Sequence, residues 1–113
     1  MAAVANLSID QGATFTSDVT IKDINGNTFN LTGYTPRAKM ALGYASTRTR
    51  VTMTTTVASD ATSGIVTLSL TDTQTSSLDD ARYVYDVEIV NDSSGAVTRV
   101  IEGIITVRPN VTT

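Results

Sequence analysis

The residues from Arg82 to Val107 carry the clearest alternation of apolar and polar positions in the chain. Over the first nine of them, apolar residues hold one parity and carboxylates the other: Tyr83, Tyr85, Val87 and Ile89 against Asp86 and Glu88. Because successive side chains of a strand point to opposite faces, this split predicts a strand with one buried face. The turn-forming residues 91–95 follow, and residues 96–107 are again rich in β-branched apolar side chains. The pattern therefore predicts a β-hairpin.

Shorter segments with the same alternation precede this hairpin and are separated by turn residues. We expect strands over 13–24, 28–31, 37–44, 51–58 and 65–70, with 4–9 as a short first strand or an ordered arm. The residues expected to face the core are Phe15, Val19, Ile21, Ala38, Met40, Leu42, Tyr44, Val51, Met53, Thr55, Val57, Val66, Leu68 and Leu70. Asn25-Gly26 is typical of a type I′ hairpin turn, in which both central residues take positive φ.

The remaining segments predict one helical turn and a tail. Residues 72–78 form the one helix candidate, with Thr71 or Asp72 as its cap, and we expect it to place Leu78 under the sheet. Pro109 lacks a ladder donor, so residues 108–113 are expected to form an extended tail. Seven or eight short strands with turns between them predict an all-β sandwich of two antiparallel sheets, in a single domain spanning residues 1–113.

Composition narrows the chemistry available to the chain. Its 113 residues contain no histidine and no cysteine, which excludes the usual zinc ligand sets and histidine-based general bases. A net charge of −3 disfavours a nucleic-acid partner, which requires clustered cations. No apolar run approaches the ~20 residues that cross a bilayer, and Met1-Ala-Ala-Val lacks the charged start of a signal peptide. We therefore expect a protein made in a cytoplasm, with neither nucleic acid nor membrane as a partner.

Three carboxylates of the hairpin are the strongest candidates for a chemical site. Asp86 and Glu88 lie two residues apart on one strand face, and Glu102 is expected opposite them. Clustered oxygens suit calcium, and paired carboxylates suit acid–base catalysis. The alternative, which we prefer, is a solvated face where these carboxylates meet basic side chains: Arg99, Arg108 or Lys39.

Other charged groups have simpler interpretations. The segment 23–27 begins like a calcium loop, but its glycine is misplaced and no glutamate follows, so a hairpin turn is preferred. Asp79 and Asp80 are expected either at an exposed corner or capping backbone amides. Half of the basic residues fall between positions 37 and 50, as either an anionic-partner surface or ordinary solvated charge: Arg37, Lys39, Arg48 and Arg50.

Several segments together resemble a known family. They are 28–35 (TFNLTGYT), 64–71 (GIVTLSLT) with Gln74-Thr75 and Leu78, 82–86 (RYVYD), and 97–103 (VTRVIEG) with Val107. This spaced signature, from about Leu7 to Thr112, looks like small virion structural proteins of tailed bacteriophages, particularly marine cyanobacterial phages. It is also similar to the amino-terminal module of phage baseplate upper proteins. Asp80-Ala81-Arg82 stands where that family often has a glycine before the arginine. Baseplate modules of this family normally carry further domains, and we expect this chain to be the module alone.

The resemblance implies an immunoglobulin-like β-sandwich that builds virions and is not an enzyme, with no cofactor. Its implied partners are other virion proteins, either the major capsid protein or tail and baseplate proteins, with a homo-oligomer left open. Its implied location is the virion, assembled in the host cytoplasm. We expect partner contacts at Val4, Leu7, Ile9, Arg37, Arg48, Arg50 and Val111. The alternative function is a receptor- or carbohydrate-binding module, which would gain support from Tyr34 and Tyr44 exposed together in a groove.

Overall fold

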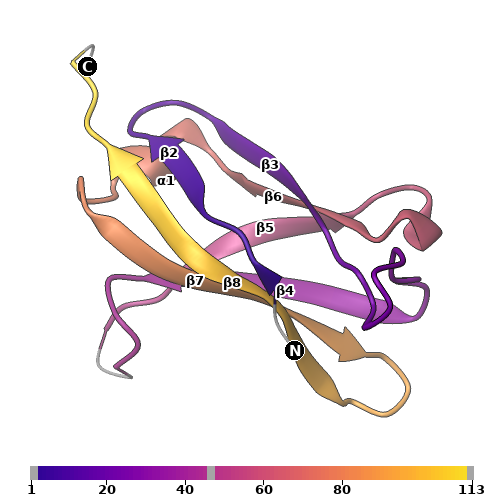
Figure 1. The fold of residues 1–113 in the computed structure, drawn as a ribbon. Coiled ribbons are helices and arrows are strands. Elements are labelled where there is room, and N and C mark those ends of the chain that lie inside the picture. Colours follow the sequence, from indigo (N-terminus) through magenta and orange to yellow (C-terminus); the bar gives the residue numbers. More distant parts are fainter. Residues whose placement is uncertain (1–2, 46–47, 112–113) are drawn as a thin grey trace.

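The computed structural model describes residues 3–45 and 48–111, which form eight strands and two short helical segments (Figure 1). In chain order these are β1 (Ala3–Val4), β2 (Leu7–Asp10), β3 (Phe15–Thr20), β4 (Tyr34–Ala41), β5 (Val51–Val57), η1 (Ala61–Ser63), β6 (Ile65–Leu70), α1 (Asp72–Ser76), β7 (Arg82–Asn91) and β8 (Val97–Arg108). The β7–β8 hairpin predicted from the alternation is therefore present, with bounds within two residues of those expected.

The strands form two layers joined by β5. One layer runs β8–β7–β4, with β1 and β2 on the outer edge of β8; the other runs β3–β6–β5. β5 pairs first with β4, from Val51 to Met53, and then with β6, from Thr54 to Val57. All pairs are antiparallel except those of β1 and β2, which run parallel to β8. This arrangement confirms the predicted sandwich and adds a parallel N-terminal edge.

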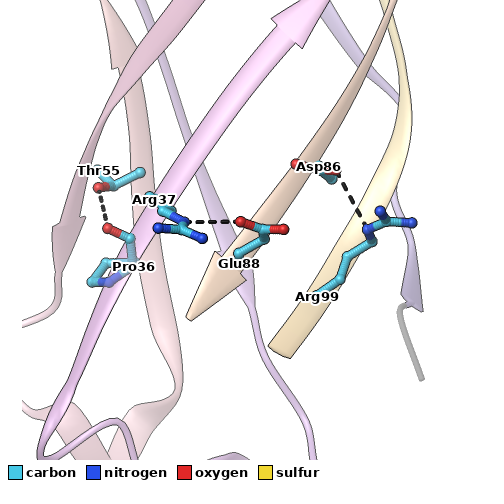
Figure 2. Close-up of polar contacts among 6 residues, drawn as sticks. All are labelled: Pro36, Arg37, Thr55, Asp86, Glu88 and Arg99. Carbon is cyan, nitrogen blue, oxygen red and sulfur yellow. Dashed lines mark hydrogen bonds and ion pairs between the residues drawn. The ribbon is translucent and has the colours of Figure 1, made fainter. Parts of the chain in front are cut away.

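β5 changes layers between Met53 and Thr54, and the side chain of Thr55 still reaches β4. The Thr55 hydroxyl donates a hydrogen bond of 3.1 Å to the carbonyl of Pro36 on β4, where the backbone ladder between the two strands has ended (Figure 2). Pro36 lies beyond the last β4–β5 pair. Because proline has no amide hydrogen, no backbone donor is left without an acceptor at this position. The hydroxyl of Thr55 thus links β5 to β4 beyond the point where their backbones stop pairing.

The core lies between the layers and follows the predicted parity of β7. Tyr83, Tyr85, Val87 and Ile89 are all buried, whereas Asp86 and Glu88 lie on the outer face. The opposing layer contributes Val66, Leu68 and Leu70, which are also buried as predicted. Burial of such side chains removes apolar surface from water at roughly 25 cal/mol per Å², the main stabilising term of the fold.

β8 contains a bulge that the alternation did not predict. Val87 pairs with Ile101 and Glu88 pairs with Arg99, so Val100 is an extra residue on β8. Val100 and Ile101 are consecutive residues, yet both pack against the core. The alternation of inner and outer side chains along β8 is therefore shifted by one residue from Arg99 backwards. The bulge thereby places Arg99 on the outer face, beside the carboxylates of β7.

The strand expected over 37–44 was misplaced. β4 begins at Tyr34 and ends at Ala41, so Leu42 and Tyr44, expected in the core, are 40% and 77% exposed. The chain leaves the sheet because the guanidinium of Arg50 holds the following loop. It donates to four loop carbonyls, those of Gly43, Tyr44, Ala45 and Arg48, at 3.1–3.4 Å.

The turn at Asn25-Gly26 is also different from the type expected. Gly26 has φ of 84°, but no other residue type in the described chain has positive φ, so the type I′ assignment was wrong. Ile24, Asn25 and Gly26 form a three-residue loop closed by Asp23 and Asn27, whose backbones bond at 2.8 Å. Only the isolated bridge between Lys22 and Thr28 remains of the strand expected over 28–31.

The helical turn and the corner after it were predicted in outline. Thr71 caps α1 in a reciprocal capping box with Gln74, and Leu78 is buried beneath it as expected. The Tyr83 hydroxyl then accepts a hydrogen bond of 2.9 Å from the amide of Asp79, four residues upstream. This contact corresponds to the tyrosine corner of immunoglobulin-type sandwiches. In the described part of the chain, no helix has the length and apolar character to cross a membrane.

Candidate functional site

The outer face of β4, β7 and β8 carries six of the charged residues that the sequence brought forward. The strand register aligns them in two rows: Lys39, Asp86 and Glu102 in one, and Arg37, Glu88 and Arg99 in the other. The three candidate carboxylates are therefore neighbours, as predicted. The arrangement of the basic residues around them decides their chemistry.

Two ion pairs engage the carboxylates of β7. Arg37 Nε lies 2.8 Å from Glu88 Oε1, and Arg99 Nε lies 3.4 Å from Asp86 Oδ2 (Figure 2). The sequence anticipated Arg99 as a partner but not Arg37. Among residues 3–45 and 48–111, no three acidic side chains are arranged to hold a metal ion. The preferred prediction of a charged, ion-paired face thus agrees with the geometry.

Burial, followed by the neighbouring Glu88 carboxylate, raises the pKa of Asp86 above its usual value, against the lowering effect of Arg99. A carboxyl whose pKa is higher in the folded state destabilises the fold when ionised, and this penalty disappears as the pH falls through that pKa. We expect Asp86→Asn to raise the melting temperature slightly at pH 7, by less than the ~4 °C that about 1 kcal/mol gives such a domain.

Thermal melts of both proteins between pH 7 and pH 3 provide the measurement. The advantage of Asp86→Asn should shrink toward acid pH, where the wild-type carboxyl is also neutral. A variant that is less stable at pH 7 would instead mean that the Arg99 pair, 3.4 Å long, outweighs the cost of burying the charge.

The basic residues between 37 and 50 do not form one surface. Arg37 and Lys39 belong to the two charged rows, and Arg50 lines a hollow with Lys39 and Asp86 while its guanidinium donates to the carbonyls of its own loop. Arg48 lines a separate cavity of about 540 Å³ with Leu42, Leu78 and Asp79, next to the tyrosine corner.

The apolar residues expected to contact partners fall into an exposed group and a buried group. Val4 and Val111 are 73% and 98% exposed, as contact residues must be. Leu7 is half-buried against the core, and Ile9 is only 1% exposed. Ile9 pairs with Val107 on β8, and its side chain is buried in the core. The partner contact expected at Ile9 therefore does not fit its burial.

Of the other acidic candidates, Asp23 stabilises a turn, whereas Asp79 and Asp80 are exposed at a corner. One carboxylate oxygen of Asp23 accepts hydrogen bonds from the amides of Asn25 and Asn27, at 2.9 and 3.0 Å, and so holds the turn together. This use of the carboxylate agrees with the preferred hairpin interpretation. Asp79 and Asp80 are exposed at the corner before β7, consistent with the first of the two alternatives for them.

An apolar groove of about 590 Å³ was not anticipated from the sequence. It lies between the Asp23 turn and the β7–β8 hairpin, and its walls include Ile24, Phe29, Tyr34 and Val100. The rings of Phe29 and Tyr34 pack edge to face, with centroids 5.2 Å apart. The exposed Ile24 in a turn was the one available signal, because turn tips are usually polar.

Tyr34 and Tyr44 are not exposed together. Tyr34 packs on Phe29 in this groove, while Tyr44 lies in the loop after β4, beside Lys39 and Arg50. The pair of exposed aromatic rings that would favour carbohydrate stacking is therefore not formed by these residues.

Comparisons with known proteins give a likeness in fold. No family model and no curated protein matches the chain. Among solved structures, the N-terminal domain of phage TP901-1 ORF48 matches with a TM-score of 0.56 and 12% identity, covering 92% of this chain and 85% of that one. A chicken TCR matches with a TM-score of 0.55 and 12% identity, covering 95% of this chain and 54% of that one. These likenesses confirm an immunoglobulin-like β-sandwich, and one of the two structures is a phage protein domain.

Proposed function

We propose that this protein is a structural component of a bacteriophage virion, without enzymatic activity, that docks on the particle as a single immunoglobulin-like module. The observation that carries the proposal is the match to the N-terminal domain of phage TP901-1 ORF48, which extends over 92% of this chain and 85% of that domain. The match spans the whole sandwich rather than one hairpin. It also agrees in kind with the tailed-phage resemblance of the segments 28–35, 64–71, 82–86 and 97–103.

The composition and surface of the molecule support a role in assembly rather than catalysis. The chain has neither histidine nor cysteine, and Asp86 and Glu88, the carboxylates best placed for chemistry, are each ion-paired to an arginine. Beside those pairs, Val97 and Ile104 are exposed on β8, and Val4 is exposed on the adjoining β1. Apolar side chains flanking charged rows on a sheet face suit contact with another protein.

Within the virion, we propose either decoration of the capsid or a place in the tail, neck or baseplate, in contact with the major capsid protein or with tail proteins. These locations differ in copy number, since a shell offers many equivalent sites and a tail offers few. A receptor- or carbohydrate-binding module is the less favoured alternative, because Tyr34 and Tyr44 line different parts of the surface.

The composition of purified particles tests this proposal. Quantitative mass spectrometry of virions, purified from lysates of the host that expresses the gene, should find the protein at a constant ratio to the major capsid protein. Treatment of the lysate with salt and detergent before purification controls for adhering host protein. Particles that are infectious and complete but lack the protein would end the proposal.

A further inference from the structure

The groove between the Asp23 turn and the β7–β8 hairpin has a protruding side chain on its own rim. Ile24 is 100% exposed in the turn between β3 and β4. The connection between these two strands reaches the end of the molecule away from the C-terminal tail (Figure 1). The turn that carries it is held by the Asp23 carboxylate, by the 3.0 Å bond from the Gly26 amide to the Asp23 carbonyl, and by Gly26 at φ of 84°. A large apolar side chain is thus displayed on a preorganised loop, which lowers the entropic cost of binding.

The groove beside Ile24 has the size and lining of a binding site. Its volume of about 590 Å³ lies within the usual range of ligand pockets, roughly 300–1,000 Å³. Phe29 and Tyr34, which are in edge-to-face contact, line the groove together with Val100. Val100 reaches this position because it is the extra residue of the β8 bulge. The bulge therefore shapes the groove as well as re-aiming Arg99.

The charges at the groove favour a copy of the same surface as its occupant. Lys22 and Asp23 both line the groove and carry opposite charges. Across a two-fold axis, a surface with one adjacent charge of each sign can place each charge opposite its counterpart, whereas a surface of one sign repels its copy. Neither residue takes part in an ion pair within the described chain, and the amide bonds that hold the turn go to one oxygen of the Asp23 carboxylate. The Lys22 ammonium and the second Asp23 oxygen can therefore meet a partner.

We propose that this end of the molecule binds a second copy of the chain through a two-fold interface, in which Ile24 of each copy enters the groove of the other. The protruding side chain and the apolar groove lie on one surface, as a self-complementary interface requires. Each dimer contains this contact twice. The proposal concerns the protein in solution and does not depend on a virion location.

Substitutions on the two sides of the contact test the proposal without disturbing the core. Ile24→Glu places a charge on a side chain that is fully exposed in the monomer, and Thr98→Arg puts a long cation at an exposed position of the groove wall. Each should weaken dimerisation by about 100-fold or more, because a symmetric interface loses the contact twice. Tyr44→Glu, at an exposed site in a different loop, is the matched control and should dimerise like the wild type.

Mixing the two variants makes the test specific. In a mixed dimer, one Ile24 still enters a groove in which Thr98 is unchanged, and at the second contact the introduced carboxylate faces the introduced guanidinium. Sedimentation velocity up to near-millimolar protein, with circular dichroism to confirm folding, should show dimers for the wild type and for the equimolar mixture, but monomers for each variant alone.

Other results overturn the proposal. A wild-type chain that stays monomeric throughout the concentration series would mean that the groove accepts no second copy. Dimers that survive Ile24→Glu, or that are broken by Tyr44→Glu, would place the interface elsewhere. Two monomeric variants whose mixture does not associate would contradict the two-fold pairing of Ile24 with the groove.

Discussion

Replacing Val87 with aspartate should abolish cooperative folding of the domain. Val87 is 0% exposed at the centre of β7, between Ala38 on β4 and Ile101 on β8, both of which are also buried. A carboxylate there would have no basic partner on the inner face, and an unpaired buried charge costs several kcal/mol. That cost is comparable with the total stability of a domain of this size, about 5–15 kcal/mol.

The matched control is Val90→Asp, three residues further along the same strand. Val90 is only partly buried and lies opposite Val97, on the outer face. We expect chemical denaturation to give a normal cooperative transition for Val90→Asp and none for Val87→Asp. If Val87→Asp remained soluble and unfolded cooperatively near the wild-type midpoint, the inner face of β7 would not be the core.

Replacing Gly103 with alanine should detach the N-terminal segment from β8. A Cβ atom at this position would clash with the carbonyl oxygen of Ala5, because the two atoms would be closer than their radii allow. The segment would have to move, losing the bond from Ala5 N to Glu102 O (2.9 Å) and the bond from the Ile104 amide to Asn6 Oδ1 (3.1 Å). It would also lose the bond that the Tyr85 hydroxyl donates to Ala5 O. At about 1 kcal/mol each, we expect a loss of roughly 3 kcal/mol.

Two measurements identify this outcome. Amide hydrogen exchange should accelerate over residues 5–10 well before the rest of the sheet is affected. Burial raises the pKa of Tyr85 to about 12 in the wild type, and exposure of this phenol should lower its pKa toward 10, adding a tyrosinate to the ultraviolet spectrum between pH 10 and 11.

Gly43→Ala provides the comparison, because the nearest atoms to a Cβ there are on the Arg48 side chain at 3.7 Å, an ordinary contact. It should leave both exchange and the tyrosine titration unchanged. Undiminished protection of residues 5–10 in Gly103→Ala would show that β1 and β2 are not held against β8 in this way.

The features that local pattern determines were predictable from the sequence. The burial of Tyr83, Tyr85, Val87 and Ile89 followed from their parity, because a strand with one buried face permits little else. The sequence also offered Thr71 or Asp72 as the cap of α1, and Thr71 is the residue that caps it. The two-layer arrangement was predictable from the number and spacing of such segments.

Features that depend on contacts between distant segments were not predictable. Leu42 and Tyr44 continue the alternation of β4, but Arg50 binds the carbonyls that follow and draws the chain out of the sheet. Asn25-Gly26 has a type I′ sequence, but the Asp23 carboxylate selects a longer loop by binding two of its amides. In both cases a side chain satisfied backbone groups that the local pattern would have assigned to a ladder.

The candidate site likewise has a part that could be predicted from the sequence and a part that could not. Asp86, Glu88 and Glu102 could be grouped from sequence because hairpin register follows from the turn between the strands. The pairing of Arg37 with Glu88 required the antiparallel contact of β4 with β7, which joins residues 51 positions apart. The groove is formed jointly by the Val100 bulge, the Asp23 turn and the Phe29–Tyr34 pair. Because these lie in different segments, no single segment of the sequence predicts the groove.

Electron microscopy of purified virions tests the central claim most directly. If the protein is a virion structural module, particle reconstructions should contain repeated density that fits the sandwich, including the β7–β8 hairpin and the parallel N-terminal edge. Density on the shell in hundreds of copies would indicate capsid decoration, and a few copies on the tail would indicate a neck or baseplate part. Complete, infectious particles with all density assigned to other proteins would contradict the account.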